Sequence, residues 1–285
     1  MERNENGQFI KGGIPHNKKD KIELICKTCG KKYYRAYWES KRTSYCSIKC
    51  KRIYTLNENI FENINTEEKA YWLGFILADG SIYKRTYIRK DGIKTVKQSV
   101  LKISLQEKDK QHIIKFCNFL ETNMPIKEYI VGNGVNDKKS KCCEIAITSK
   151  KIVGDLEKLG VGIRKSHSVK MPKIRDDLIK HMIRGIWDGD GSVLYRPRNK
   201  KYPNNFNPSI QICGNENILD YINNLFEQEL NIKPSKLSGV GSIFLFRKSC
   251  STAKKIVEYL YKNSNVYLNR KYENALYCMN WTSKK

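Results

Sequence analysis

The chain of 285 residues carries 54 Lys and Arg against 29 Asp and Glu, which gives a formal net charge of +25. Because 40% of the residues are hydrophobic, the composition supports a packed core and excludes a disordered chain. Self-repulsion makes such a charge costly unless a polyanion neutralises it, so we expect a nucleic-acid partner.

The chain contains no apolar run of about 20 residues, the length that a membrane-spanning helix needs. Its first residues, MERNENGQFIKGG, lack the hydrophobic region of a signal peptide. We therefore expect no membrane association and no secretion, but a location in the cytoplasm or in the compartment of the target nucleic acid (a phage-infected cell, a bacterial cytosol or an organelle). Four of the ten cysteines are clustered and the other six are scattered, which favours a reduced protein over a disulfide-bonded one.

Residues 1–57 are predicted to form a basic arm followed by a small zinc-binding module. Cys26 and Cys29 make one close pair, and Cys46 and Cys50 make a second pair after sixteen intervening residues. Two thiolate pairs at this spacing suit one tetrahedral, structural Zn²⁺, which would stabilise a segment too small to build its own core. Four unrelated buried thiols are the alternative, which the pairing disfavours.

The surroundings of these cysteines are basic and aromatic. Gly30 permits a tight turn after the first pair. The segment 31–45 is predicted to form a short hairpin, and a helix is expected to start within 48–60. The nearby cations either rest on phosphates or simply keep the segment solvated; they are Lys31, Lys32, Arg35, Lys41 and Arg42.

The rest of the chain repeats itself. A five-residue set recurs 111 residues later: Gly74, Ala78, Asp79, Gly80 and Ser81 return as Gly185, Gly189, Asp190, Gly191 and Ser192. Lys-Lys-Ile-Val at 150–153 returns at 254–257, and Arg-Lys at 164–165 returns at 270–271. Three matches in the same order and at similar separations indicate an internal duplication, with repeats at 66–172 and 173–285.

Hydrophobic periodicity predicts the order αββαββα in each repeat, and therefore an α+β fold. The helices are expected at 66–79, 108–121, 174–190 and 217–230, with last helices opening near Ser149 and Ser251. The clearer strands are expected at 100–106, 143–148, 208–213 and 242–247. Basic loops are expected at 85–97 and 197–207. A sheet covered by helices on one face leaves its other face free, and this charge directs that face towards nucleic acid.

The helices at 66–79 and 174–190 are predicted to pack against each other. Gly74 and Ala78 lie four residues apart, as do Gly185 and Gly189, so each pair occupies one helix face. A glycine inside a helix costs about 1 kcal/mol relative to alanine. Its presence in both repeats therefore indicates a close approach of the two helix backbones.

This packing is expected to bring Asp79 and Asp190 together at one end of the helix pair, with Gly80 and Gly191 as the C′ residues. Two carboxylates beside unpaired helix carbonyls repel each other unless cations lie between them. Hard divalent ions suit this position, Mg²⁺ first, and they would activate water and stabilise a leaving oxygen in phosphodiester hydrolysis.

Alternatives exist for these acids. An Asp-Gly pair at a helix end is a common turn by itself. The sequence from Asp188 to Gly191 faintly suggests a calcium loop, but Val193 stands where the turn glycine of that loop belongs.

Residues 72–80 (WLGFILADG) and 183–191 (IRGIWDGDG) resemble the paired motifs of single-chain LAGLIDADG homing endonucleases, and the resemblance covers about 66–280. It implies two pseudo-symmetric repeats whose sheets form a DNA-binding saddle, with Asp79 and Asp190 as metal-binding acids beside Gly80 and Gly191. It also implies basic residues beside the scissile phosphates, for which Lys165 and Lys271 are the candidates, although ordinary surface lysines explain them almost as well. Leu77 departs from the motif opposite Asp188, at a position that is not a metal ligand in the family. The four-cysteine module resembles knuckles at the ends of mobile-element nucleases.

Strand alternation assigns the residues expected to face DNA. They are Tyr83, Arg85, Lys102, Ser104, Gln106, Arg196, Ser209 and Gln211. Because the two repeats differ, the expected target is long and asymmetric, and the expected protein is a monomer with internal pseudo-twofold symmetry.

The predicted function is Mg²⁺-dependent, staggered cleavage of double-stranded DNA, with two or more Mg²⁺ ions and one structural Zn²⁺. An RNA-binding intron maturase and a non-cleaving DNA-binding regulator on the same fold are the alternatives. Loss of Asp79 or Asp190 would favour one of these two non-cleaving alternatives, but the sequence retains both acids. An intein is not expected, because the chain starts Met-Glu and ends Ser-Lys-Lys.

Overall fold

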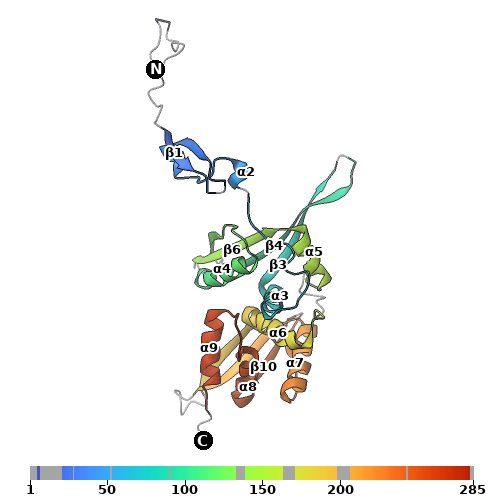
Figure 1. Ribbon diagram of the computed structural model, residues 1–285. Helices are drawn as coiled ribbons and strands as arrows, with labels where there is room; N and C mark the ends of the chain where they lie inside the picture. The colour runs from blue at the N-terminus through green and yellow to red at the C-terminus, as the bar shows by residue number, and fades with distance from the viewer. Residues whose placement is uncertain are drawn as a thin grey trace. The chain divides into compact units, whose positions relative to one another are not determined.

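The computed structural model describes residues 5–6, 21–27, 29–51, 53–89, 91–132, 139–162, 171–197, 206–241 and 243–282 (Figure 1). The chain divides into two units, Met1–Thr55 and Leu56–Lys285, and the larger unit contains both repeats. In the parts of the chain that the structure describes, no helix combines the length and the apolar character needed to cross a membrane.

The smaller unit contains a two-stranded antiparallel sheet and two short helices. Its elements are β1 (Lys21–Ile25), β2 (Lys32–Ala36), α1 (Tyr37–Ser40) and α2 (Ile48–Lys51). The hairpin predicted within 31–45 is wrong, because β2 pairs with β1, which precedes the first cysteine pair, and α1 follows β2. Gly30, at φ +69°, turns the chain back between the two strands. The helix expected after the second pair is the short α2.

The larger unit contains two copies of αββαββα, as predicted. The first copy consists of α3 (Glu67–Asp79), β3 (Gly80–Ile88), β4 (Lys94–Gln106), the 3₁₀ turn η1 (Glu107–Asp109), α4 (Lys110–Phe119), β5 (Lys127–Gly132), β6 (Lys139–Thr148) and α5 (Lys150–Lys158). The second consists of α6 (Asp176–Asp190), β7 (Gly191–Pro197), β8 (Phe206–Gly214), α7 (Glu216–Leu230), β9 (Ser238–Val240), β10 (Ile243–Ser249) and α8 (Cys250–Tyr261), and is followed by α9 (Asn269–Met279).

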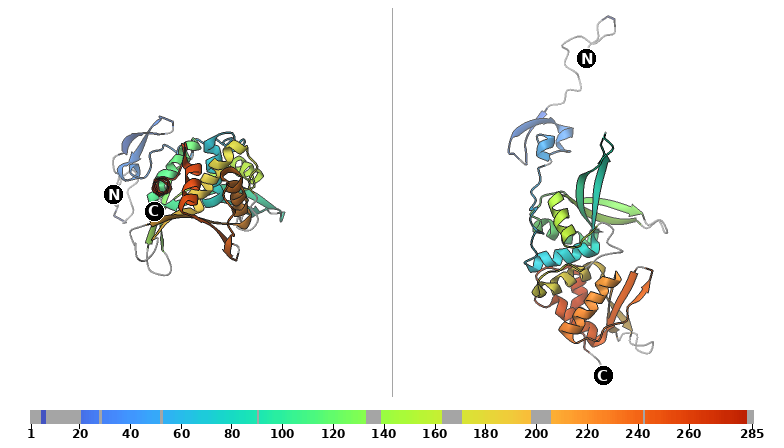
Figure 2. Two further views of the ribbon diagram at one scale, coloured as in Figure 1. Left: turned by 90° about the horizontal axis from the view of Figure 1, so that it is seen from below. Right: turned by 90° about the vertical axis from the view of Figure 1, so that its right-hand side faces the viewer.

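The two sheets have the same topology. Their strand orders are β3-β4-β6-β5 and β7-β8-β10-β9. The register is also equivalent, since Gly80 pairs with Ile103 and Gly191 pairs with Ile212. Figure 2 shows the helices of Leu56–Lys285 on one side and the two curved sheets on the other. The duplication read from the sequence is therefore a duplication of structure.

One expected loop is mostly strand. Residues 85–97 lie largely in the hairpin of β3 and β4, which runs to Ile88 and Lys94 and has a register shift between Arg85 and Thr86. Basic side chains do not prevent this pairing, because the backbone supplies the hydrogen bonds of the ladder. Most of the second expected loop, 198–205, lies outside the described residues.

Strand alternation and helix burial produce the core. In β4, Leu101 and Ile103 are fully or almost fully buried, as predicted, while Lys102 and Ser104 are partly exposed. Helix α3 is buried from Ala70 to Leu77, so it lies inside the unit rather than on its surface. This burial on all sides is explained by its partner helix α6, from the other repeat.

Candidate functional site

The close approach of α3 and α6 is possible only because glycines lie at the contact. A Cβ atom on Gly74 would lie 1.9 Å from the carbonyl oxygen of Met182. A Cβ on Gly185 would lie 2.0 Å from the carbonyl oxygen of Tyr71 and 2.6 Å from the backbone nitrogen of Phe75. Because these obstacles are backbone atoms of the facing helix, no larger residue fits at this spacing. The predicted reason for both glycines is thus present in the structure.

The line of contact between α3 and α6, here called the seam, ends at the two acids. A Cβ on Gly189 would lie 2.3 Å from the Cβ of Ala78 and 3.4 Å from a carboxylate oxygen of Asp79. Asp190, the residue after Gly189, is the last residue of α6, and Asp79 is the last residue of α3. Asp79 is partly exposed and Asp190 is exposed. The packing therefore places both acids at one accessible end of the seam.

The glycines after the acids differ from the expectation. Gly80 and Gly191 are C-caps with extended backbone, at φ −75° and −89°, not left-handed C′ residues. Each glycine instead begins a strand directly after its helix. A Cβ on Gly80 would meet Ile76 at 2.8 Å, and one on Gly191 would meet the Trp187 carbonyl at 2.7 Å. The absence of a side chain therefore permits a helix-to-strand corner.

Lys271 lies near these acids. It belongs to the first turn of α9, is 9% exposed, and donates a hydrogen bond to the carbonyl oxygen of Gly191. The pKa of Lys271 is lowered, first by burial and then by the neighbouring charge of Arg270, and the carboxylates of Asp188, Asp79 and Asp190 offset part of this effect. The other lysine candidate, Lys165, lies outside the described residues.

Asp188 is fully buried and connects the two repeats. Its carboxylate accepts hydrogen bonds from Tyr71 of α3 at 2.6 Å, from Tyr261 of α8, and from the backbone N–H of Leu268 at 2.7 Å. Burial raises the pKa of Asp188, while these donors favour its charged form. Asp188 therefore serves to connect α3, α6, α8 and the start of α9, because its carboxylate oxygens are occupied by donors from the protein itself.

A second buried polar group reinforces this junction. Arg184 is completely buried and donates to Glu67 of α3 at 2.7 Å and to the carbonyl oxygens of Leu260 and Val266 at 3.1 and 3.0 Å. Glu67 also accepts from the backbone N–H of Asn265 at 2.8 Å. An unpaired charge at this depth would be strongly destabilising, so the satisfied network fixes one arrangement of the repeats.

The segment that leads to Lys271 is held by the first repeat as well. Lys115 of α4 donates to the carbonyl oxygen of Tyr267 at 3.0 Å and to the side chain of Asn269 at 2.7 Å. Arg270 forms an ion pair with Asp109 at 2.8 Å and a second hydrogen bond to it at 3.1 Å. Both repeats thus determine where α9 begins.

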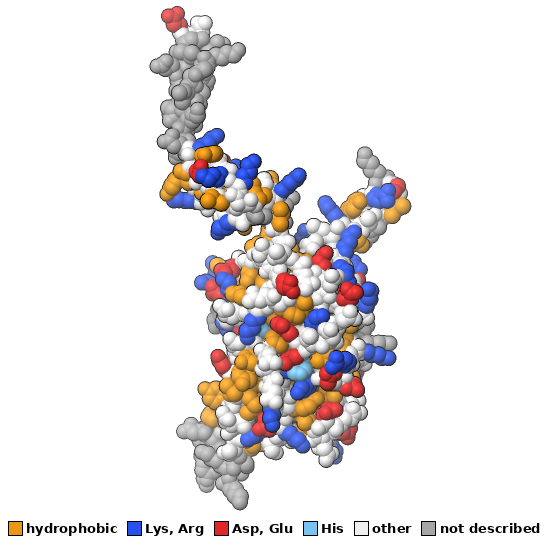
Figure 3. All heavy atoms as spheres, in the orientation of Figure 1, with side chains coloured by type: hydrophobic (Ala, Val, Ile, Leu, Met, Phe, Trp, Pro, Cys, Tyr) orange, Lys and Arg blue, Asp and Glu red, His pale blue; other side chains and the backbone are white. Residues whose placement is uncertain are grey.

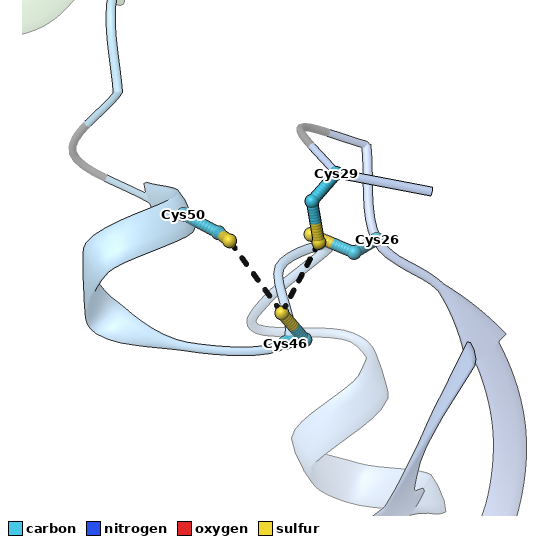
Figure 4. A group of neighbouring side chains, drawn as sticks. All are labelled: Cys26, Cys29, Cys46 and Cys50. Atoms are coloured by element: carbon cyan, nitrogen blue, oxygen red, sulfur yellow. Dashed lines mark hydrogen bonds between the residues drawn. The ribbon is translucent and has the colours of Figure 1, made fainter. Parts of the chain in front are cut away.

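The four cysteines of the smaller unit converge (Figure 4), and their sulfur atoms all lie within 4.8 Å of one another. The sulfur of Cys46 lies 3.6 Å from that of Cys29 and 3.5 Å from that of Cys50. The hydrogen bond with Cys50 contributes most to raising the pKa of Cys46 to about 12. Zn–S bonds of about 2.3 Å place tetrahedral sulfurs slightly under 4 Å apart. The donor set and its spacing therefore fit one zinc ion.

Several residues predicted to face DNA share the outer face of the first sheet. Tyr83 and Arg85 alternate with the buried Ile82 on β3, and the Arg85 guanidinium lies 5.8 Å from the Tyr83 ring centre. On β4, Lys102 and Ser104 both contact Glu144 of β6, at 3.1 Å each. Gln106 is exposed.

In the second sheet, the three residues predicted to face DNA differ in their exposure and description. Gln211 accepts a hydrogen bond from Arg247 of β10 at 3.2 Å. Ser209 is only 4% exposed and therefore does not reach the surface that was expected for it. The equivalent registers place Ser209 where the buried Val100 lies in the first repeat, so this position is buried in both sheets. Arg196 lies in β7, and its side chain is outside the description.

Glu144 and Arg247 were missed by the sequence reasoning. Glu144 alternates with Cys143 and Ile145, which are buried, so strand parity alone places it on the outer face. Arg247 follows the buried Phe246 in the same way. The predicted strands at 143–148 and 242–247 contain both residues, but only the cross-strand pairing places Glu144 beside Ser104 and Arg247 beside Gln211.

Comparison with known proteins gives a match to solved structures. No protein-family model matches the chain. A stretch of 134 residues is 26% identical to the replication factor C small subunit of Methanocaldococcus jannaschii, and it covers 46% of this chain but 6% of that protein. The chain therefore spans only a small part of the length of this relative.

The larger unit is similar to solved homing endonucleases. The I-SmaMI LAGLIDADG homing endonuclease bound to cleaved DNA matches with a TM-score of 0.51 and 14% identity, over 76% of this chain and 89% of that chain. The LAGLIDADG meganuclease I-CpaMI bound to uncleaved DNA matches with a TM-score of 0.51 and 15% identity, over 75% and 90% of the two chains. This chain has the LAGLIDADG homing endonuclease fold. The recognition of the two motifs in the sequence is thereby confirmed at the level of the fold.

Proposed function

We propose that this protein is a site-specific endonuclease that hydrolyses both strands of double-stranded DNA at a long, asymmetric target. The packing of α3 against α6 carries the proposal, because it brings Asp79 and Asp190 to the same end of the seam. A retained acid in each repeat provides one candidate metal-binding residue for each DNA strand. The structural likeness to DNA-bound LAGLIDADG homing endonucleases supports this assignment.

The residues at the end of the seam fit divalent cations. Asp79 and Asp190 supply hard oxygen ligands, and the carbonyls at the C-terminal ends of α3 and α6 add negative potential. Bound Mg²⁺, in two or more positions, would supply an activated water and neutralise charge on the leaving oxygen. The ammonium of Lys271 adds a fixed positive charge beside these acids, where a scissile phosphate would lie.

The outer faces of the sheets are the proposed DNA-binding surface. Positive groups would hold phosphates, and Gln, Arg and Glu side chains have the donor and acceptor patterns that distinguish bases in the major groove. We assign this surface to Tyr83, Arg85, Lys102, Ser104, Gln106, Glu144, Arg196, Gln211 and Arg247. Since the residues of the two sheets differ, the two halves of the target should differ as well.

We further propose that one chain suffices for cutting, that the smaller unit holds one structural Zn²⁺, and that the protein works in the cytoplasm or in the compartment of its target DNA. The internal duplication supports the first point, because both acids are in one chain. The four converging sulfurs support the second.

Cleavage of plasmids is the direct test. Candidate uninterrupted insertion sites, taken from the genomic neighbourhood of the coding sequence, are cloned and incubated with the protein and Mg²⁺. Wild type should linearise one of these plasmids with a short stagger, and omission of divalent metal should prevent it. Asp79→Asn and Asp190→Asn should still bind that plasmid without linearising it. Binding without any cutting by wild type would instead indicate a DNA-binding regulator.

A further inference from the structure

The smaller unit exposes aromatic rings that carry cations. Tyr37 and Trp38 are 58% and 50% exposed. The ammonium of Lys41 lies 4.8 Å from the Tyr37 ring centre, and the guanidinium of Arg42 lies 5.3 Å from the Trp38 ring centre. Together with Arg35 these residues form one surface, which we call the Trp38 face. None of its members is among the zinc-binding candidates.

The charge of this unit is strongly unbalanced. Residues 21–51 contain nine Lys and Arg but two acids, Glu23 and Glu39. Glu23 is paired with Lys32 at 2.8 Å, and Glu39 is paired with Arg35 at 3.6 Å. Across the residues that the structure describes, Lys41 and Arg42 form no ion pair. Their charges are therefore available to an external anion. Figure 3 shows blue Lys and Arg side chains interleaved with orange hydrophobic ones on the visible face of this unit.

The Trp38 face is also hollowed. An open pocket beside the Trp38 ring is lined by Arg35, Trp38, Glu39, Arg42, Thr43, Tyr45, Ser47 and Ile48. Two guanidinium groups and an indole ring thus border one concavity. Guanidinium groups match phosphate oxygens in a bidentate geometry, and the adjoining ring restricts the orientation of the cation. A zinc ion that only stabilises the unit requires no such arrangement at its surface.

We propose that the Trp38 face binds the phosphate backbone of duplex DNA beside the target, so that the zinc-containing unit is a second DNA-binding element. This inference rests on the proposed nuclease function for its biological setting. Backbone phosphates fit better than stacked bases, because each ring already carries its own cation and presents positive charge. The covalent link to Leu56–Lys285 makes this second contact intramolecular, which raises its effective concentration on DNA already bound by the sheets.

The test compares two double variants of the full-length protein. Lys41→Gln with Arg42→Gln removes the cations that lie on the rings. Lys21→Gln with Lys49→Gln removes the same formal charge from other surface positions of the same unit. Each protein is first shown to contain one zinc per chain, which verifies that the unit is folded. Binding to a duplex several helical turns long, of arbitrary sequence and without added divalent metal, is then measured over a range of salt concentrations.

The Lys41 and Arg42 variant should bind about 10-fold or more weakly, and its slope of log affinity against log salt should fall by about 2, because two phosphate contacts are lost. The slope of the control should stay near that of wild type. Equal slopes for wild type and the Lys41 and Arg42 variant would overturn the proposal. So would a preference of the Trp38 face for a single-stranded RNA or DNA competitor, seen as a larger loss on that competitor than on the duplex.

A cleavage assay separates this inference from the proposed function. The Lys41 and Arg42 variant should still cut its target at saturating protein, with a hydroxyl-radical footprint shortened on one side. If wild type cuts nothing but the salt slopes differ as stated, the proposed nuclease function is wrong, while the binding of DNA phosphates by the Trp38 face is supported. If wild type cuts its target and the footprints of wild type and the Lys41 and Arg42 variant are identical, only the proposed DNA binding by the Trp38 face is wrong.

Discussion

The carboxylate of Asp188 accepts a hydrogen bond from the backbone N–H of Leu268 at 2.7 Å. Leu268 is the N-cap of α9, so a buried negative charge lies at the positive end of this helix. Three residues later Lys271 donates to the carbonyl of Gly191. Because Asp188 precedes Asp190 by two residues on α6, one helix positions both a candidate metal-binding acid and the start of the helix that carries the lysine.

Asp188→Asn should destabilise the protein and slow cleavage. The variant keeps the shape of the side chain, but its amide N–H₂ would face a donor among Tyr71, Tyr261 and Leu268. Loss of a charged acceptor at a buried site is expected to cost about 2–3 kcal/mol of unfolding free energy. Urea denaturation measures this cost. Tyr71→Phe leaves the carboxylate in place but removes one of its donors and also the acceptor of His112, so it should cost about 1–3 kcal/mol. Equal stability of wild type and Asp188→Asn would contradict the assigned role.

Gly185→Ala should prevent the close packing of α3 and α6. Its Cβ would overlap backbone atoms of Tyr71 and Phe75, which belong to a buried helix and have no room to move. We expect a loss of about 3 kcal/mol or more, the upper range for overpacking. Gly154→Ala in α5 is the matched control, because its Cβ would meet no atom within 4 Å. It should stabilise by about 1 kcal/mol, the helix propensity difference. Thermal unfolding of both variants distinguishes a steric clash with the facing helix from an effect of helix propensity. If both variants were destabilised alike, the assigned steric role of Gly185 would be wrong.

The parts of the site that the sequence predicts depend on short spacings. Gly74 with Ala78, Gly185 with Gly189, and the acids at the helix ends follow from helix periodicity and from recurrence, both visible in the chain. The environment of Asp188 does not, because its partners Tyr261 and Leu268 lie 73 and 80 residues away. The burial of Ser209 likewise depends on which strand lies beside it, and alternation along one strand does not contain that information.

Stability should fall as the pH decreases below about 6.5, the ordinary pKa of histidine. The hydroxyl of Tyr71 donates its proton in the hydrogen bond to Asp188. In the hydrogen bond between Tyr71 and His112, Nε2 of the neutral imidazole is therefore the donor and the Tyr71 oxygen the acceptor. Burial lowers the pKa of His112 to about 3. Between these two pKa values the unfolded chain binds a proton that the folded chain does not, which favours unfolding by up to about 1.4 kcal/mol per pH unit.

His112→Gln isolates this contribution, because glutamine retains an N–H donor for Tyr71 but does not titrate. His181 has its pKa lowered to about 4, so part of the pH dependence should remain. Unfolding free energies at several pH values between 7 and 5 should give a shallower slope for the variant. Parallel curves for the two proteins would show that His112 is not the titrating group.

Removal of zinc should unfold the smaller unit and leave the larger one intact. Zinc binding supplies free energy on the order of 10 kcal/mol in small metal-dependent units. Chelation should therefore expose residues 21–51 to trypsin, while the melting temperature of Leu56–Lys285 stays unchanged. Cys46→Ser should behave like the chelated protein. Cys213→Ser, at an exposed cysteine of the other unit, should keep its zinc. A zinc content that is the same in both variants would exclude the four-cysteine site.

Lys271→Met should impair cleavage much more than DNA binding. The lysine is buried beside Gly191 and within the electrostatic influence of Asp79 and Asp190. Under the proposed function, its charge would therefore act at the reacting phosphate and not along the DNA-binding surface. Loss of such a fixed charge is expected to slow single-turnover cleavage by about 100-fold or more. Lys262→Met, at an exposed lysine after α8, removes the same charge and should leave the rate near that of wild type. Since Lys271 belongs to the second repeat alone, one strand should be slowed more than the other, and nicked plasmid should accumulate. Equal slowing of both strands would show that Lys271 supports the fold of the seam and not one cleavage site.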